Sequence, residues 1–250
     1  MYLRYITCSD PREHNPIPEI IELGIKPSAE IAVQCHPSKM SDGMPRNVWF
    51  NDLLRQLYDV KRMNLAIHIN SEWANEICIN GKIPDILLQW INIRDVRNKP
   101  IIKRIQINMP ELAAQNIDKT KMAQIINAFR GREFIFQYNK KTKAAVEKMH
   151  ETGAQFSLLF DASGGRGIAP GNWQKPIYET HPMGYSGGIS PDNVVHNLRE
   201  INKLVPKGTG IWIDAEGRLK SNDLFDEKPK FDAELARQYI TRARNWENVR

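Results

Sequence analysis

The sequence predicts an α/β fold, a (β/α)8 TIM barrel of parallel strands and outer helices, formed by a single domain over residues 1–250. Eight short apolar segments typical of buried parallel strands are followed by segments of helical periodicity, except between the sixth and the seventh. Each of the eight units takes about 31 residues, close to the length that such barrels use. Glycine-rich turns follow the sixth and seventh strands, whereas an open doubly wound sheet usually carries them after the first.

The elements can be assigned in order along the chain. We expect strands at residues 3–8, 29–34, 64–70, 104–108, 133–137, 156–161, the PMGYS segment before Gly187, and 210–214. We expect helices at residues 18–23, 51–58, two pieces broken near Gly81 and restarted at 84–93, 119–129, 142–151, 191–204 and 232–244. Residues 36–48 form a long segment rich in turn-forming residues, which favours a substrate loop.

Composition and charge narrow the class of protein. Hydrophobic residues make up 41% of the chain and charged residues 26%, as in ordinary globular domains. No apolar run approaches the roughly 18 residues that span a bilayer, and the N-terminal segment lacks the pattern of a signal peptide. We therefore expect no membrane association and a cytoplasmic location. The net charge of +6 is spread among acidic residues without a basic stripe, which argues against nucleic-acid binding.

The cysteines give no sign of a disulfide framework or a metal site. Cys8, Cys35 and Cys78 are an odd number without CxxC spacing. His36 follows Cys35 directly, but no further ligand stands at a metal-like spacing. We expect reduced thiols, no metal and no organic cofactor.

Residues suited to proton transfer stand at the ends of predicted strands, where barrel active sites form. Cys8 and Asp161 could act as base or acid if their pKa values were brought toward neutrality. Asp10, two residues beyond Cys8, is a rival base. His68, on an apolar strand, is expected to be a satisfied core residue. Further polar candidates at strand ends are His36, Arg46, Asn70, Asn108, Gln137 and Asp214.

The glycine-rich turns predict an anion site. Gly164 and Gly165 follow the sixth strand, and Gly187 and Gly188 follow the seventh, just before a helix expected to open at Ser190. Such turns expose backbone N–H groups and let a ligand approach the chain closely. A phosphate is the ligand that we expect there, as part of a phosphorylated small-molecule substrate.

Several segments together resemble a known family. They are, in chain order, Ile6-Thr7-Cys8, Pro45-Arg46-Asn47-Val48, Leu159-Phe160-Asp161 with Gly164-Gly165-Arg166-Gly167 and Trp173, Ser186-Gly187-Gly188-Ile189-Ser190-Pro191-Asp192-Asn193-Val194, and Ile213-Asp214. The series resembles phosphoribosylanthranilate isomerase, a barrel of tryptophan biosynthesis. The polar segment 220–230 and the terminal helix also match that family's ending. The resemblance covers the whole chain and is most specific in its last third.

The resemblance implies an Amadori rearrangement of a phosphorylated aminoaldose to an aminoketose, without a cofactor. By position, Cys8 would be the general base and Asp161 the general acid. The substrate would contact Arg46, Asp214, Gly164 and Gly165. The backbone of Gly187, Gly188, Ile189 and Gly217 would hold the phosphate.

Some positions differ from the family and leave alternatives open. Glu216 stands where the family has a small, hydroxyl-rich turn, and a carboxylate facing a phosphate would repel it. Asn108 replaces the family's histidine-glycine, and Ser9 replaces the glycine after the catalytic cysteine. A non-catalytic or regulatory barrel that binds a phosphate ligand is therefore the alternative function. Another enzyme of sugar phosphates, such as an aldolase or epimerase, is a third.

Overall fold

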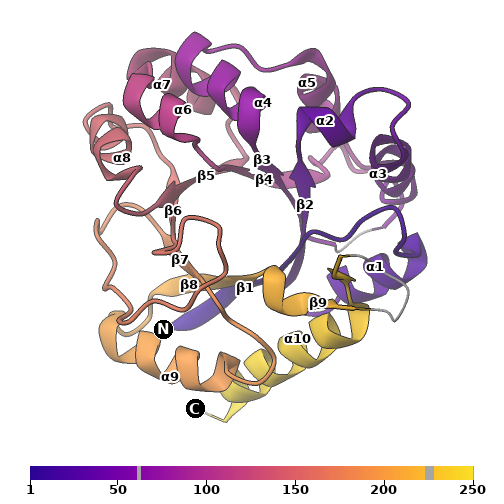
Figure 1. Ribbon diagram of the computed structural model, residues 1–250, viewed down its shortest axis with the longest axis vertical. Coiled ribbons are helices and arrows are strands. Elements are labelled where there is room, and N and C mark those ends of the chain that lie inside the picture. Colours follow the sequence, from indigo (N-terminus) through magenta and orange to yellow (C-terminus); the bar gives the residue numbers. More distant parts are fainter. Residues whose placement is uncertain (61–62, 223–227, 250) are drawn as a thin grey trace.

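The computed structural model describes residues 1–60, 63–222 and 228–249 and contains a closed parallel barrel in the order β1 to β8 (Figure 1). The predicted TIM-barrel fold is confirmed. Its strands are β1 (Tyr2–Ser9), β2 (Ala29–Cys35), β3 (Leu65–Ile69), β4 (Ile102–Ile107), β5 (Glu133–Tyr138), β6 (Ser157–Phe160), β7 (Met183–Ser186) and β8 (Gly210–Ala215).

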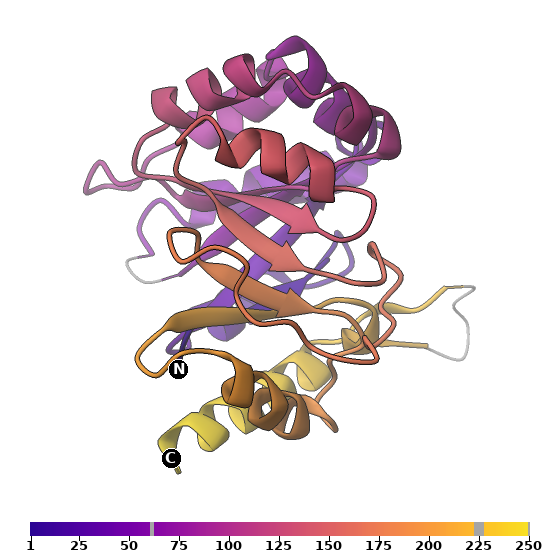
Figure 2. The ribbon, with the colours of Figure 1, turned by 90° about the vertical axis from the view of Figure 1, so that its left-hand side faces the viewer.

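Helices surround the barrel, and α9 and α10 lie side by side against the part of it formed by β8 and β1 (Figures 1 and 2). The helices are α1 (Ile17–Gly24), α2 (Pro37–Met40), α3 (Pro45–Gln56), α4 (Ser71–Asn75), the π-helix η1 (Glu76–Asn80), α5 (Asp85–Asn92), α6 (Glu111–Asn116), α7 (Lys119–Ala128), α8 (Lys143–His150), α9 (Val194–Leu204), the 3-10 turn η2 (Gly217–Leu219) and α10 (Ala233–Asn248).

Two local predictions need correction. Residues 36–48 are not one loop, because they contain α2 and the start of α3, where Pro45 supplies a first-turn residue that needs no N–H partner. Between β6 and β7, where the sequence predicts no helix, residues 161–182 run as an irregular connection across the barrel's C-terminal end. Helix α9 begins three residues later than expected, at Val194, because the Asn193 side chain accepts the Ser190 N–H at 2.8 Å and closes a turn ahead of it.

A short hairpin follows the barrel. Strand β9 (Lys220–Ser221) pairs antiparallel with β10 (Lys230–Phe231), and this pairing places Lys220 beside the C-terminal end of β1. The polar segment 220–230 was predicted to match the family's ending, but its residues 223–227 lie outside the described residues.

The interior of the barrel is polar near its base. Arg104 on β4 is almost fully buried and forms ion pairs with Glu30 at 2.6 Å and Glu133 at 3.2 Å. Its guanidinium also lies 4.3 Å from the ring centroids of both Tyr5 and Trp212, a cation–π sandwich. Because alternate strand residues face opposite sides of the sheet, these side chains point into the barrel. The apolar residues between them face the surrounding helices.

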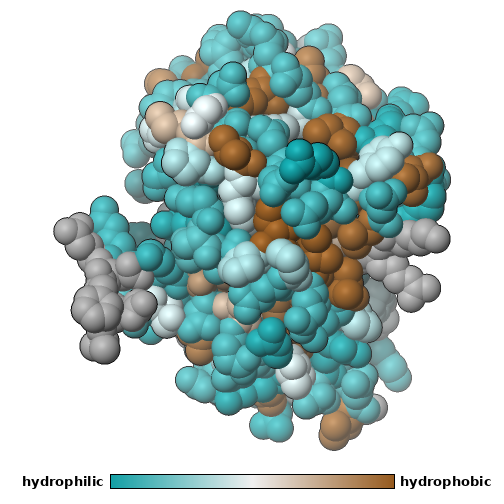
Figure 3. All heavy atoms as spheres, turned by 90° about the vertical axis from the view of Figure 1, so that its right-hand side faces the viewer, coloured by the Kyte–Doolittle hydropathy of each residue, from teal (hydrophilic) through white to brown (hydrophobic). Residues whose placement is uncertain are grey.

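The outer surface is mostly hydrophilic, with apolar patches on the side of α1 and α3 (Figure 3). Ile25, directly after α1, and Val48 in α3 are 46% and 57% exposed. Among the described residues, no helix has the length and apolar character needed to cross a bilayer.

Replacing Arg104 is expected to destabilise the fold strongly. Arg104→Ala leaves Glu30 and Glu133 without their shared cation, and breaking a buried ion pair costs about 3–5 kcal/mol. Arg4→Ala is the matched control, because Arg4 also pairs with Glu133, at 2.9 Å, but is 28% exposed; it should cost about 1 kcal/mol or less. Denaturant unfolding measures both. Similar small losses in the two variants would contradict an essential interior ion cluster.

Candidate functional site

One cavity opens at the C-terminal ends of the strands, where barrel active sites form. Its volume is about 130 Å³. Strand ends β2 to β8 and the turns that follow β6, β7 and β8 supply its walls. The lining residues are Gln34, His68, Gln106, Asn108, Gln137, Leu159, Asp161, Gly165, Arg166, Gly167, Ser186, Gly187, Gly188, Ile189, Asp214, Ala215, Glu216, Gly217 and Arg218.

Asp214 is the cavity carboxyl best suited to proton transfer. It lies near the end of β8, where the Ser9 hydroxyl donates to its Oδ1 at 2.6 Å. Burial, together with the charge of Glu216, outweighs that hydrogen bond and raises the pKa of Asp214 to about 7. A group with this pKa can both give and take a proton near neutral pH.

Asp161 lines the same cavity but is held by four donors. Its Oδ1 accepts the N–H and hydroxyl of Ser163 at 3.0 and 2.7 Å. Its Oδ2 accepts Gln137 Nε2 at 2.8 Å and the Gly165 N–H at 2.5 Å. A carboxylate surrounded by donors acts as an acceptor. Asp161 therefore fixes the turn after β6.

The two predicted glycines of that turn donate hydrogen bonds to Asp161. Gly164 donates its N–H to the Asp161 carbonyl at 3.1 Å and does not line the cavity, whereas Gly165 does. Both have positive φ, 64° and 87°, which favours glycine.

Unpaired backbone donors gather at the turns after β7 and β8. Among the described residues, the N–H groups of Gly187, Gly188 and Ile189 donate to no acceptor, and neither do those of Gly217 and Arg218. All five residues line the cavity. Gly187 and Ile189 are buried, whereas Gly217 and Arg218 are exposed, and buried N–H groups are nearly always paired with protein, water or ligand. The predicted phosphate-binding residues thus meet at one wall, in the position where barrels often hold phosphate.

Two arginines stand at the same wall. Arg166 follows β6 and Arg218 follows β8; both are exposed, and neither forms an ion pair with an acidic residue in the described part of the chain. Arg166 is oriented by its own Nε, which donates to the Ser163 carbonyl at 2.9 Å. Their positive charge favours an anion at this wall.

Glycine at 187 and 188 is also required by close packing. The irregular connection 161–182 crosses these residues, and a Cβ added at Gly187 would lie 2.8 Å from the Ile168 carbonyl oxygen. At Gly188 an added Cβ would lie 2.7 Å from the Ala169 nitrogen. The same glycines therefore bring the connection over the cavity and expose backbone donors to it.

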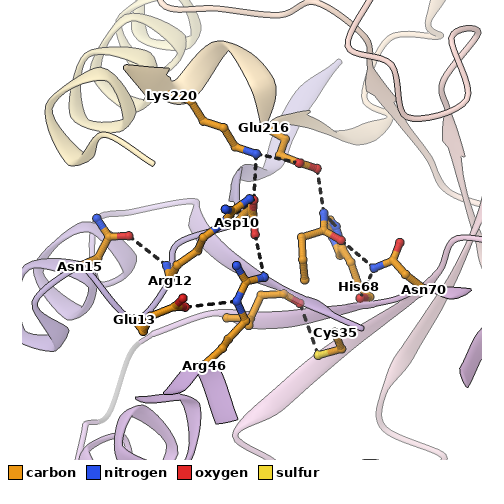
Figure 4. Close-up of polar contacts among 12 residues, drawn as sticks. Asp10, Arg12, Glu13, Asn15, Cys35, Arg46, His68, Asn70, Glu216 and Lys220 are labelled. Carbon is orange, nitrogen blue, oxygen red and sulfur yellow. Dashed lines mark hydrogen bonds and ion pairs between the residues drawn. The ribbon is translucent and has the colours of Figure 1, made fainter. Parts of the chain in front are cut away.

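Glu216 does face the cavity, but its carboxylate is directed away from the glycine turn. Its Oε2 accepts Gln34 Nε2 of β2 at 2.8 Å, and its Oε1 accepts Lys220 Nζ at 3.1 Å (Figure 4). In the barrel, β1 and β2 lie on one side of β8 and β7 on the other. Pairing with Lys220 and pointing toward β2 both reduce the repulsion that Glu216 would exert on a phosphate near β7.

A row of polar side chains, which sequence reasoning did not recognise, lies deeper in the cavity. Gln34, His68 and Gln106 are register neighbours on β2, β3 and β4. His68, predicted to be a core residue, is buried but lines the cavity. The sequence did contain a sign of this row: each of the three strands is otherwise apolar and carries one polar residue near its end. Because alternate residues of a strand face opposite sides of the sheet, such residues can all face the barrel interior.

Cys8 does not belong to the cavity. The hydroxyls of its neighbours Thr7 and Ser9 bond Glu30 and Asp214 inside the barrel, so the side chain between them points outward. Cys8 is fully buried in the core between barrel and helices. Burial and the charge of Asp214 raise the pKa of the thiol well above its usual value. The structure therefore presents Ser9, not Cys8, to the site.

Arg46 and the rival base Asp10 are also placed outside the cavity, in an ion cluster below Lys220 (Figure 4). Arg46 is buried in the first turn of α3 and pairs with Asp10 at 3.4 Å and Glu13 at 3.3 Å. Burial alone would raise the pKa of Asp10, but contacts with Arg12 and Lys220 outweigh it and lower that pKa. Arg46 is thus not free to bind a substrate carboxylate, and Asp10 is a poor base.

The raised pKa of Asp214 predicts a pH-dependent stability. The folded protein keeps this proton up to pH about 7, whereas an unfolded chain releases it near pH 3.9. The free energy of unfolding should therefore fall as pH rises from about 4 to about 7, by on the order of 2–4 kcal/mol from this group. Asp214→Asn should lack that component in denaturant unfolding at several pH values. Parallel curves for the two proteins would contradict the assignment.

Comparisons with known proteins leave the family open. No protein-family model and no curated protein matches the sequence. Among solved structures, the chain is similar to 3-hexulose-6-phosphate synthase from Salmonella typhimurium, with a TM-score of 0.49 and 12% identity over 97% of this chain and 99% of that chain. A similarity at this level adds nothing to what the strand order establishes. The TIM-barrel fold therefore rests on the closed barrel itself, and the resemblance to phosphoribosylanthranilate isomerase remains a hypothesis.

Proposed function

We propose that this barrel is an isomerase that converts a phosphorylated aminoaldose, or a closely related aldose phosphate, to the ketose by proton transfer on Asp214. One observation carries the proposal: a carboxyl with a pKa of about 7 lines the same cavity as the unpaired N–H groups of the β7 and β8 turns. An isomerase of this kind needs one site for the phosphate and one group that exchanges a proton with the sugar.

The phosphate would bind at the wall formed by Gly187, Gly188, Ile189 and Gly217. Their N–H groups would donate to its oxygens, and Arg166 and Arg218 would balance its charge. This wall fixes one end of the substrate, so that the sugar extends toward Asp214 and the polar row on β2 to β4.

Asp214 can serve both proton transfers of an Amadori rearrangement. As an acid it gives its proton to the ring oxygen; the C1–O bond breaks, and the nitrogen lone pair forms the C1=N iminium. The resulting carboxylate takes the C2 proton, the electrons of the C–H bond form a C1=C2 double bond, and the C1=N π electrons return to nitrogen, which gives an enaminol. Return of that proton to C1, with loss of the hydroxyl proton on C2 to water, gives the aminoketose. Asp161 holds the turn after β6 and acts as a positioning residue.

A non-catalytic barrel that binds a phosphate ligand is the second candidate. It is favoured by the outward orientation of Cys8, the base that the family resemblance implies, and by the connection packed over Gly187 and Gly188. Such a protein would use the same phosphate wall without proton transfer.

Turnover of phosphoribosylanthranilate, followed by loss of its fluorescence, tests the isomerase. We expect Asp214→Asn to lower kcat by about 10²–10⁴-fold, the usual contribution of a general acid or base. Cys8→Ala is the discriminating control and should keep kcat within a few-fold, because the thiol faces the helices. A Cys8 variant that folds but is inactive would contradict the use of Asp214. Binding of the compound without turnover would favour the non-catalytic barrel.

The pH dependence of turnover has a defined sign. Because the sequence of steps begins with proton donation by Asp214, kcat/KM should fall above pH about 7, where the acid form is lost. Measurement of kcat/KM from pH 5 to 9 checks this. If kcat/KM instead falls only as the pH drops below 7, the free enzyme needs the carboxylate form of Asp214, and another group donates the first proton.

A further inference from the structure

We propose that His68 is a further catalytic residue: a neutral imidazole whose Nε2–H donates a hydrogen bond to the oxygen on C2 of the substrate, the atom that becomes the ketose carbonyl. The proposal rests on the proposed function and names the group that stabilises this oxygen as charge develops on it.

Neighbouring side chains fix the tautomer of His68. Gln34 Nε2 lies 2.8 Å from Glu216 Oε2 and 3.2 Å from His68 Nδ1 (Figure 4). A carboxylate can only accept, so the Gln34 atom facing it must be the NH2 group. Its second hydrogen then points at His68 Nδ1, which must accept it. The imidazole proton is therefore on Nε2.

The orientation of Gln34 is itself held at its other end. Asn70 Nδ2 donates to Gln34 Oε1 at 2.8 Å and to the His68 carbonyl at 2.8 Å. Asn108 Nδ2 in turn donates to Asn70 Oδ1 at 2.9 Å. Lys220 holds Glu216 from the opposite side, at 3.1 Å. The series of hydrogen bonds from Lys220 to His68 is therefore compatible with one tautomer of the imidazole, the one protonated on Nε2.

His68 stays neutral at working pH. Burial and the positive charge of Arg104 lower the pKa of His68 to about 3, and the weaker attraction of Asp10 does not offset them. Its register neighbours, Gln34 and Gln106, are uncharged amides. A neutral imidazole can stabilise a developing oxyanion by donating a hydrogen bond without delivering its proton to a nearby carboxylate.

The position of His68 fits this task. Its Nε2 has no acceptor among the described residues, and the side chain lines the cavity that Asp214 also lines. The donor comes from β3 and the proton-transfer group from β8, so a sugar held at the phosphate wall would meet them from two directions. Negative charge develops on the C2 oxygen in the last step, when the C2 hydroxyl loses its proton as Asp214 returns a proton to C1, and the Nε2–H would lie at this oxygen.

The tautomer can be tested without any ligand. Long-range ¹H–¹⁵N NMR of the full-length protein, with His68 assigned by comparison with His68→Gln, should show a neutral ring protonated on Nε2 throughout pH 5 to 8. A ring protonated on Nδ1, or one that becomes charged in this range, overturns the proposal whether or not the protein is an isomerase.

Two ligands test the contact itself. The hydroxamate derived from erythronate 4-phosphate imitates the planar enediol of a five-carbon sugar phosphate, whereas ribitol 5-phosphate carries the phosphate on a saturated chain of the same length. Calorimetry should show that His68→Ala weakens hydroxamate binding about 10- to 100-fold and changes ribitol 5-phosphate binding less than about twofold. His68→Gln, which keeps an N–H donor, should recover most of the loss. The exposed His196→Ala is the matched control and should match the wild type.

Each other outcome decides against the proposal. Equal weakening of both ligands in His68→Ala would mean that His68 only maintains the cavity, and no weakening would mean that it does not touch the ligand. In both cases the phosphate site would stand. If neither ligand binds the wild type, the phosphate wall itself fails, and the proposals for the isomerase and for His68 fall together.

Discussion

The buried guanidinium of Arg104 is the interaction on which the rest of the structure depends. It lies inside the barrel between two carboxylates and two aromatic rings, all from different strands. An ion cluster of this kind tolerates little change, because loss of one partner leaves an uncompensated charge out of water. It therefore fixes the register and spacing of strands far apart in the sequence. Its charge also lowers the pKa of His68 above it and so bears on the chemistry of the cavity.

The two sides of the cavity differ in the charge that they favour. Unpaired N–H groups at the turns after β7 and β8, together with Arg166 after β6 and Arg218 after β8, favour an anion on one side of the cavity. Toward β2 and β3, Glu216 and its neighbours form a hydrogen-bonded chain that ends at a neutral imidazole. Asp214 lies between them, and its pKa of about 7 follows from burial beside the charge of Glu216. The Glu216 carboxylate, predicted from the sequence to repel a phosphate, thus contributes to the raised pKa of Asp214.

The turn at Gly187 and Gly188 shows one sequence feature meeting two physical demands. Both residues have positive φ, which favours glycine, and line the cavity with unpaired N–H groups, while the missing side chains admit the connection that crosses them. An alanine at either position would strain the backbone and collide with that connection. A role in folding and a role in binding are therefore not alternatives here.

The sequence alone determined the barrel, the number and order of its strands, the glycine turns after β6 and β7, and the placement of Asp161 and Asp214 at strand ends. These depend on local periodicity and on backbone conformation, which can be recognised in short segments of the sequence. Which side of β1 faces the site is visible only in the closed barrel, because a shift of one residue along a strand exchanges Cys8 for Ser9. The tertiary structure alone also showed that Glu216 turns toward Gln34, that Arg46 is held by Asp10 and Glu13, and that His68 is part of the cavity. Each of these depends on partners distant in sequence, and closure of the barrel is what brings them together.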